Sequence, residues 1–205
     1  MSLKNLTQYP SLKIRQRREL AEFFGFETRN KYEIQTVDGR IIGFAAEQQK
    51  GFLGLLLRQV LGHWRRFEIH VFDEQRQLSL VATHPFRFWL QRLEIVAHPS
   101  GQFLGALQQR FALFSKRFDV EDEQRNVAME VRSPIWKIWT FEFKKMDRVV
   151  ATLKKRWSGV FKEAFLDADN FEVQFNDGNL RDKERLLLLA AALFVDLQYF
   201  EKKGD

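Results

Sequence analysis

The C-terminal segment at 181–201 restricts the fold of this chain more than any other stretch of its sequence. It is rich in strong helix formers, and its uninterrupted apolar run extends only from Leu186 to Val195. A helix that spans a bilayer needs about 20 mainly apolar residues, and a charge at depth costs a few kcal/mol, yet Asp196 follows this run directly. The segment therefore predicts a helix that is apolar on nearly every side because protein surrounds it.

Most side chains of this predicted helix are expected to face a hydrophobic core. For Asp196 we expect either a hydrogen bond from its carboxylate to the surrounding structure or the emergence of the helix at that point. The expected core residues are Leu186, Leu187, Leu189, Ala190, Leu193, Phe194 and Leu197.

Short candidate strands fill most of the chain before the helix. The alternating runs at 32–37 and 40–44 are joined by Asp38-Gly39, the strongest short-range signal for a hairpin. Many short strands at such spacing indicate an antiparallel sandwich or barrel, and a barrel closed around the helix accounts for both features. The further candidate strands lie at 67–72, 77–83, 88–96, 103–110, 112–118, 127–132, 137–143, 149–155 and 170–175.

The N-terminal part of the chain is basic and carries a second helical pattern. Residues 15–24 predict a short helix that ends at Gly25, and the stretch at 13–18 adds positive charge. Residues 1–10 lack the pattern of a secretory signal, so no export is expected. With no low-complexity stretch or linker, the sequence predicts one domain over 1–205, composed of a lead-in at 1–25, the strands, and the core helix at 181–201.

Composition narrows the classes of function. The chain has no cysteine, which excludes disulfides, thiolate metal sites, a cysteine nucleophile and a palmitoyl anchor. A net charge of +6 favours acidic partners, either membrane phosphates or nucleic acid. The sequence contains no glycine-rich phosphate loop, nucleophile elbow or zincin motif, so we predict that the protein is not an enzyme.

Several segments resemble the phospholipid scramblase family. They include Glu27-Thr-Arg-Asn-Lys-Tyr-Glu-Ile34, Arg66-Phe-Glu-Ile-His-Val-Phe-Asp73 and, most specifically, the stretch from Trp157 to Phe175; the similarity covers about residues 19–201. The resemblance implies a β-rich tubby-like fold, in which a closed antiparallel barrel is threaded by a hydrophobic C-terminal helix. It also implies ATP-independent, calcium-stimulated, bidirectional movement of phospholipids between leaflets. We expect a cytoplasmic protein that is peripherally associated with the inner face of the plasma membrane.

The resemblance places a calcium segment at 167–178. Asp167 and Asp169 occupy its first and third positions, where closely spaced carboxylates suit a hard cation. The last position, usually Asp in the family, is Gly178 here, and Asp177 stands one residue earlier. One interpretation is a weak Ca²⁺ site at Asp167, Asp169 and Asp177, and the alternative is a solvated turn before a strand.

The segment at 51–66 is the main candidate for membrane contact. On a helix its apolar side chains gather on one broad face with arginines at the edge, which suits the boundary between head groups and acyl chains. The alternative is packing against the protein's own barrel or against a second copy of the chain in a homo-oligomer. The residues concerned are Phe52, Leu53, Leu56, Leu57, Arg58, Trp64, Arg65 and Arg66.

A second basic cluster comprises Lys154, Lys155, Arg156 and Trp157. It is a candidate for binding anionic lipid phosphates, to which each basic residue contributes about 1 kcal/mol at low salt. An ordinary solvated strand end is the alternative. The expected partner is therefore an anionic phospholipid membrane, and the competing hypotheses are a nucleic-acid-binding module and a scaffold for protein partners.

Overall fold

The computed structural model describes residues 3, 5–17, 30–48, 66–113, 115–137, 139–156 and 170–199. Within these residues it contains twelve strands, two 3₁₀ turns and an α-helix. In chain order these elements are η1 (Leu6–Gln8), β1 (Ser11–Gln16), β2 (Lys31–Gln35), β3 (Ile41–Gln48), β4 (Phe67–Asp73), β5 (Leu78–His84), β6 (Arg92–Ala97), β7 (Phe103–Arg110), β8 (Ser115–Glu121), β9 (Val127–Pro134), η4 (Ile135–Lys137), β10 (Thr140–Lys145), β11 (Arg148–Arg156), β12 (Asn170–Phe175) and α2 (Asp182–Tyr199).

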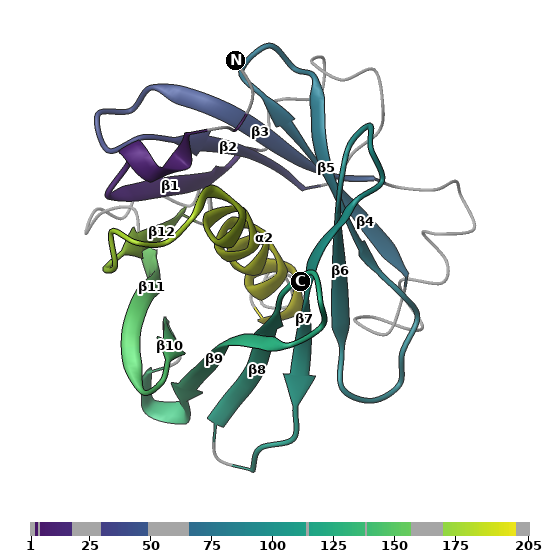
Figure 1. Ribbon diagram of the computed structural model, residues 1–205, viewed down its shortest axis with the longest axis vertical. Helices are drawn as coiled ribbons and strands as arrows, with labels where there is room; N and C mark the ends of the chain where they lie inside the picture. Colours follow the sequence, from purple (N-terminus) through teal and green to yellow (C-terminus); the bar gives the residue numbers. More distant parts are fainter. Residues whose placement is uncertain are drawn as a thin grey trace, which may run out of the picture.

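The strands form a closed barrel. Each strand pairs with its neighbours in the chain in antiparallel orientation, and β1 pairs with β12 to complete the ring. Figure 1 shows this ring with α2 inside it, and closure leaves none of the described strands with an unpaired edge. The predicted closed antiparallel barrel around a C-terminal helix is confirmed.

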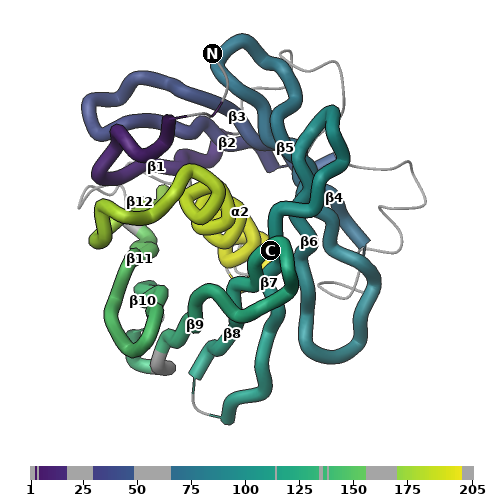
Figure 2. Tube along the Cα trace, in the orientation of Figure 1, coloured from purple at the N-terminus to yellow at the C-terminus, as the bar shows by residue number. Residues whose placement is uncertain are grey.

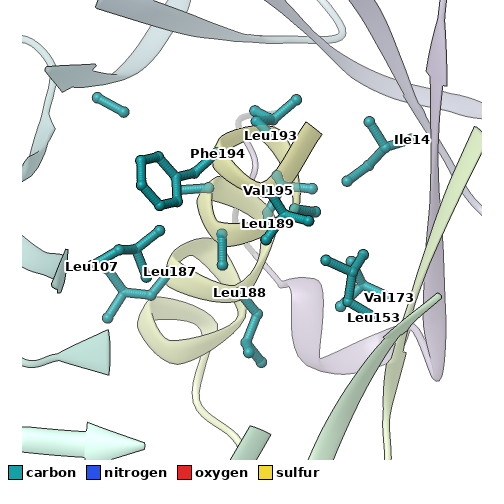
Figure 3. Close-up of a cluster of buried hydrophobic side chains, with 14 of the residues drawn as sticks. Ile14, Leu107, Leu153, Val173, Leu187, Leu188, Leu189, Leu193, Phe194 and Val195 are labelled. Atoms are coloured by element: carbon teal, nitrogen blue, oxygen red, sulfur yellow. The ribbon is translucent and has the colours of Figure 1, made fainter. Parts of the chain in front are cut away.

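Helix α2 forms the centre of the hydrophobic core. At about 1.5 Å per residue, its 18 residues extend about 27 Å through the barrel. Every residue from Leu187 to Leu197 is buried, whereas Leu186 is half-buried and packs against the edge of the core. Ile14, Leu107 and Val173 lie around the helix from three different strands (Figure 3). Among the described residues, no helix is long and apolar enough to cross a membrane.

The acidic residue within the helix is bound by the barrel wall. Asp196 is 2% exposed, and the Tyr32 hydroxyl donates a hydrogen bond of 2.6 Å to its Oδ2. A carboxylate buried in this way needs such a donor because desolvation disfavours its charged form. The predicted hydrogen bond between Asp196 and the surrounding structure is confirmed.

The chain before β1 covers the barrel end at which α2 begins, here called the helix-entry end. The backbone N–H groups of Asn5 and Thr7 donate to the Asp182 carboxylate at 2.8 and 3.0 Å. The Arg185 guanidinium donates to the carbonyl oxygens of Leu6 and Tyr9 at 3.0 and 2.6 Å. These bonds tie the backbone of residues 5–9 to side chains in the first turn of α2.

Glu184 makes the stability of this end depend on pH. Burial favours the neutral form of Glu184, but hydrogen bonds from Lys145 and from the Arg181 backbone N–H outweigh burial and hold its pKa below the ordinary value. A depressed native pKa gives stability that is present above the unfolded pKa and is lost as pH falls through the native pKa. We expect Glu184→Gln to make the decline of Tm below about pH 4.5 shallower. If Tm fell with pH equally steeply in the variant and in the unaltered protein, this linkage would be wrong.

The structure corrects the predicted helix at 15–24. Arg15 and Gln16 belong to strand β1, in which buried Leu12 and Ile14 alternate with exposed Lys13 and Arg15. Strand β1 pairs with both β12 and β2, so the barrel needs it to close. Residues 18–24 of the predicted helix lie outside the described residues.

Three predicted strands begin three or four residues later than expected. Strand β6 begins at Arg92 rather than 88, β8 at Ser115 rather than 112, and β10 at Thr140 rather than 137. In each case the residues assigned wrongly to the strand belong to the connection that precedes it. All three connections lie at the same end of the barrel, as shown below.

Candidate membrane interface

The strand order gathers one set of connections at a single end of the barrel. In an antiparallel ring, successive connections alternate between the two ends. The connections that follow β1, β3 and β7 lie at one end, beside the pairs Gln16–Tyr32, Gln48–Glu68 and Arg110–Arg117. The connections that follow β5, β9 and β11 lie at the same end because of the strand order. Helix α2 begins at the other end and reaches this one, where Tyr199 lies beside Phe141 and Lys116 near the starts of β10 and β8. Figure 2 traces the helix through the ring of strands. We call the end where Tyr199 lies the helix-exit end.

The helix-exit end includes the described parts of the predicted membrane sites. Gln48 and Arg66, on either side of the stretch at 49–65, both lie here, and an Arg66 guanidinium nitrogen is 3.4 Å from a Glu68 carboxylate oxygen. Lys154 and Lys155 lie near the end of β11. Of Arg156 only the backbone is described. The other residues of the two predicted sites lie outside the described residues: Phe52, Leu53, Leu56, Leu57, Arg58, Trp64, Arg65 and Trp157.

Lys154 and Lys155 are held differently. The Lys154 ammonium donates to Gln174 at 3.3 Å on the barrel wall. The Lys155 ammonium lies 5.3 Å from the centre of the Trp139 ring and 5.7 Å from that of Phe171, so aromatic faces stabilise its charge. The cluster thus combines cationic and aromatic groups, as an interfacial site requires.

Asp177 lies beyond the opposite end of β12, at the helix-entry end, whereas Asn170 begins that strand at the helix-exit end. The Asp177 Oδ1 accepts a 2.9 Å hydrogen bond from the Asn179 backbone N–H, and the Asp177 Oδ2 pairs with Arg148. The Asn179 bond and the Arg148 charge hold the pKa of Asp177 below its ordinary value. Asp167 and Asp169 are outside the described residues, and within the part of the chain that the structure describes no group of three acidic or histidine side chains could hold a metal.

Exposed apolar side chains that the sequence analysis did not identify also lie at the helix-exit end. Trp89 is 83% exposed, Trp136 80%, and Phe111 and Leu113 each 73%. A protein that meets only water rarely gathers so many large apolar groups at one place. We call these residues the exit rim: Phe86, Phe88, Trp89 and Leu90 between β5 and β6, Phe111 and Leu113 between β7 and β8, and Trp136 in η4.

Hydrogen bonds hold the largest part of the exit rim in place. Gln109 Oε1 accepts from the Gln91 backbone N–H at 2.9 Å, and Gln108 Nε2 donates to the Leu90 carbonyl at 3.1 Å. Leu90 adopts a left-handed backbone conformation with φ of 48°, which ends any strand before Gln91. The loop therefore presents Phe88 and Trp89 outward in a fixed arrangement.

A pocket of about 290 Å³ opens beside this loop. Its wall combines rim side chains with the basic residues Arg110, Lys116 and Arg117 and with the end of α2. The Lys116 ammonium lies 4.2 Å from the centre of the Tyr199 ring. The remaining lining residues are Phe88, Trp89, Leu90, Gln91, Gln109, Phe111, Ala112, Ser115 and Gln198.

These features define a closed barrel with a central helix and with one end that combines exposed apolar side chains and basic residues. The Scramblase family model matches residues 1–202, and the chain belongs to this family. Human phospholipid scramblase 1 is 32% identical over 99% of this chain and 67% of its own length. Bovine phospholipid scramblase 2 is 33% identical over 97% of this chain and 71% of its own length.

Two more distant likenesses extend the comparison. The Saccharomyces cerevisiae protein named altered inheritance rate of mitochondria protein 25 is 23% identical over 88% of this chain and 67% of its own. A solved structure from Arabidopsis thaliana has a TM-score of 0.47 at 14% identity, covering 92% of this chain and 91% of that one. The fold assignment rests on the strand order of this chain alone.

Proposed function

We propose that this protein binds anionic phospholipid membranes through its helix-exit end and moves phospholipids between leaflets without ATP. The names of its scramblase relatives support the lipid substrate. The observation that carries the proposal is the exit rim, a set of exposed aromatic and aliphatic side chains beside basic residues at one end of the barrel. The partner is the inner face of the plasma membrane, and no catalytic side chain takes part.

The chemistry of the exit rim suits the boundary between head groups and acyl chains. Burying one large apolar side chain contributes roughly 1.5–3 kcal/mol, and each basic residue near an anionic surface adds about 1 kcal/mol. Trp89, Trp136 and Phe111 together would therefore hold the barrel at the membrane with the α2 axis crossing the surface.

Calcium stimulation is part of the proposal. Asp167 and Asp169 stand just before β12, whose first residue lies at the helix-exit end. A divalent cation bound there would add positive charge on the side of the barrel that faces anionic lipid. Asp167→Asn with Asp169→Asn is expected to abolish any calcium effect on lipid exchange while leaving calcium-independent vesicle binding unchanged.

The proposal is tested with the purified chain in proteoliposomes. Leaflet exchange of a fluorescent phospholipid is measured with and without calcium, alongside flotation with plain anionic vesicles. We expect binding in both conditions and faster exchange with calcium. Binding without exchange would reduce the function to lipid binding, and preference for nucleic acid over vesicles would overturn the proposal in favour of a nucleic-acid-binding module.

The segment at 51–66 supplies a separate prediction. If its apolar face enters the bilayer, Leu56→Glu with Leu57→Glu should abolish vesicle flotation because two charges replace two inserted side chains. The thermal transition should stay unchanged. Undiminished flotation would show that this segment does not carry membrane binding.

A further inference from the structure

We propose that three arginines on the outer wall of the barrel bind the phosphates of anionic membrane lipids and turn the β7–β9 side of the helix-exit end toward the membrane. Arg110 in β7 lies opposite Arg117 in β8, which in turn lies opposite Arg132 in β9. We call these three residues the arginine row. This inference rests on the proposed function and adds to it the side of the barrel that meets the lipid.

The arginine row faces away from the core. Phe118 and Val131, which are next to Arg117 and Arg132 along their strands, are fully buried, and side chains alternate between the two faces of a strand. Like charges directly opposite each other destabilise a sheet, and the row contains two such cross-strand pairs. An anion that bridges the guanidinium groups from outside would offset this repulsion.

The carboxylates that pair with the arginine row do not balance its charge. Arg110 pairs with Asp119 at 2.6 Å, whereas Arg117 and Arg132 share Glu130 at 3.5 and 3.4 Å. Three positive charges thus meet two negative ones. Asp119 and Glu130 are opposite each other, two residues or about 7 Å farther from the helix-exit end than Arg117 and Arg132. They therefore hold the arginines from the side that is turned away from the membrane.

Toward the helix-exit end the adjoining connections are apolar and lack acidic residues. The sequence contains no Asp or Glu at 111–116 or at 133–141. These stretches carry the exit-rim residues Phe111, Leu113 and Trp136, each at least 73% exposed. From the helix-exit end toward the helix-entry end, the order of side chains is therefore apolar, then cationic, then anionic. This order suits a membrane boundary, where apolar side chains meet acyl chains and arginines meet phosphates while carboxylates stay in water.

The guanidinium groups of the arginine row can reach a ligand. Each ion pair engages one nitrogen, Nε in Arg110 and a terminal nitrogen in Arg117 and Arg132. A guanidinium carries five N–H donors in a planar fork that matches the geometry of a phosphate. The three side chains are between 35% and 57% exposed. Because neighbouring strands lie about 4.8 Å apart, the row extends about 10 Å, which leaves room for a phosphate at each neighbouring pair.

The position of the arginine row also gives the barrel an orientation. Figure 1 shows β8 and β9 at the bottom of the ring and β2 and β3 at the top. Contact through the row and the nearby exit rim would tilt the barrel toward β7–β9. The outer wall of β1, far from β8 in the ring, would then stay in water.

The first test removes charge from the arginine row. Arg117→Gln with Arg132→Gln should bind vesicles of phosphatidylcholine and phosphatidylglycerol about 10- to 30-fold more weakly, measured by co-sedimentation. The control, Arg76→Gln with Arg125→Gln, removes the same charge from turns at the helix-entry end. At about 0.15 M salt the Debye length is about 8 Å, so the control should bind within about two- to threefold of the unaltered protein.

Glu130→Gln has an expected effect that misfolding cannot produce. The substitution frees Arg117 and Arg132 from their shared carboxylate and should tighten vesicle binding about 3- to 5-fold. Its matched control is Glu74→Gln, which makes the same change of charge in the turn between β4 and β5 at the helix-entry end. This control should leave binding unchanged within about a factor of two.

Fluorescent labels on single cysteines show which side meets the lipid, because the chain has no cysteine of its own. Ser115 is the first residue of β8, and exposed Arg15 is the second-to-last residue of β1, so both lie near the helix-exit end. Lipids that carry a quencher on the head group should quench a label at Ser115→Cys strongly. They should quench a label at Arg15→Cys only weakly.

Three results would overturn this inference while leaving docking through the exit rim intact: equal binding by the arginine-row variant and its control, no gain of binding in Glu130→Gln, or equal quenching of the two labels. If the arginine-row variant lost affinity for duplex DNA but not for vesicles, the row would be a nucleic-acid site and the inference would be wrong. Absence of vesicle binding by the unaltered protein would instead overturn the proposed function, and this inference with it.

Discussion

Replacing Trp89 and Phe111 together with Glu is expected to weaken binding to anionic vesicles by at least about 100-fold. The two side chains are 83% and 73% exposed, so neither supports the core. Removing both from a membrane interface forfeits roughly 3–6 kcal/mol, and each 1.4 kcal/mol corresponds to about a factor of ten in Kd. The new carboxylates add repulsion from anionic lipid. Vesicle co-sedimentation over a range of lipid concentrations measures the effect.

The barrel offers a matched control at its other end. Val37 and Met146 are exposed apolar residues in the connections that follow β2 and β10, at the helix-entry end. Val37→Glu with Met146→Glu changes the net charge by the same amount as the rim variant but leaves the exit rim intact. We expect this control to bind within about a factor of two or three of the unaltered protein, since only long-range charge changes. Equal loss of binding in both variants would show that net charge, and not the exit rim, drives docking.

Local patterns in the sequence were enough to predict the elements that make up most of the barrel. The bounds of β7 and β12 agree with the predicted strands at 103–110 and 170–175, and the Asp38-Gly39 turn joins β2 to β3 as expected. The core helix was predictable from its apolar run. Because this run is too short to span a bilayer, the helix can bury its apolar side chains only in the interior of the protein.

Strand β1 could not be predicted because its partners are distant in the chain. Of the residues from Lys13 to Gln16 only Ile14 is apolar, and the basic and polar run that continues from Arg15 favours a helix at 15–24. Their strand conformation comes from pairing, with Lys13 opposite Gln35 on one side and Glu172 on the other. Strand preference depends on such neighbours more than on the residue itself.

The exit rim was missed for a similar reason. Phe86-Arg-Phe-Trp-Leu90 is rich in aromatic residues, which favours a strand at 88–96. The observed loop depends on Gln108 and Gln109, which are 18 residues from the Leu90 and Gln91 backbone groups that they bind. An exposed aromatic loop and a buried aromatic strand have the same local sequence, and only these long-range bonds distinguish them.

Gly105→Ala should destabilise the fold more than its single added methyl group suggests. Gly105 lies in β7 beside the helix, and an added Cβ would lie 2.3 Å from the Glu121 carbonyl oxygen and 3.0 Å from the Leu187 methyl groups. The backbone of β8 and the helix would both have to move. In addition, the φ of +154° at Gly105 is one that residues with side chains rarely adopt. We expect a loss of about 3 kcal/mol in unfolding free energy, or a fall in Tm of about 6–12 °C for a domain of this size.

Gly178→Ala is the control for this substitution because a Cβ at that position meets nothing within 4 Å. Alanine there reduces the freedom of the unfolded chain without a clash, so its unfolding free energy should stay unchanged or rise by about 0.4–1 kcal/mol. Urea unfolding followed by circular dichroism measures both variants. If Gly105→Ala were as stable as Gly178→Ala, the helix would not pack against β7 as closely as the barrel requires, and the central position of α2 would be wrong.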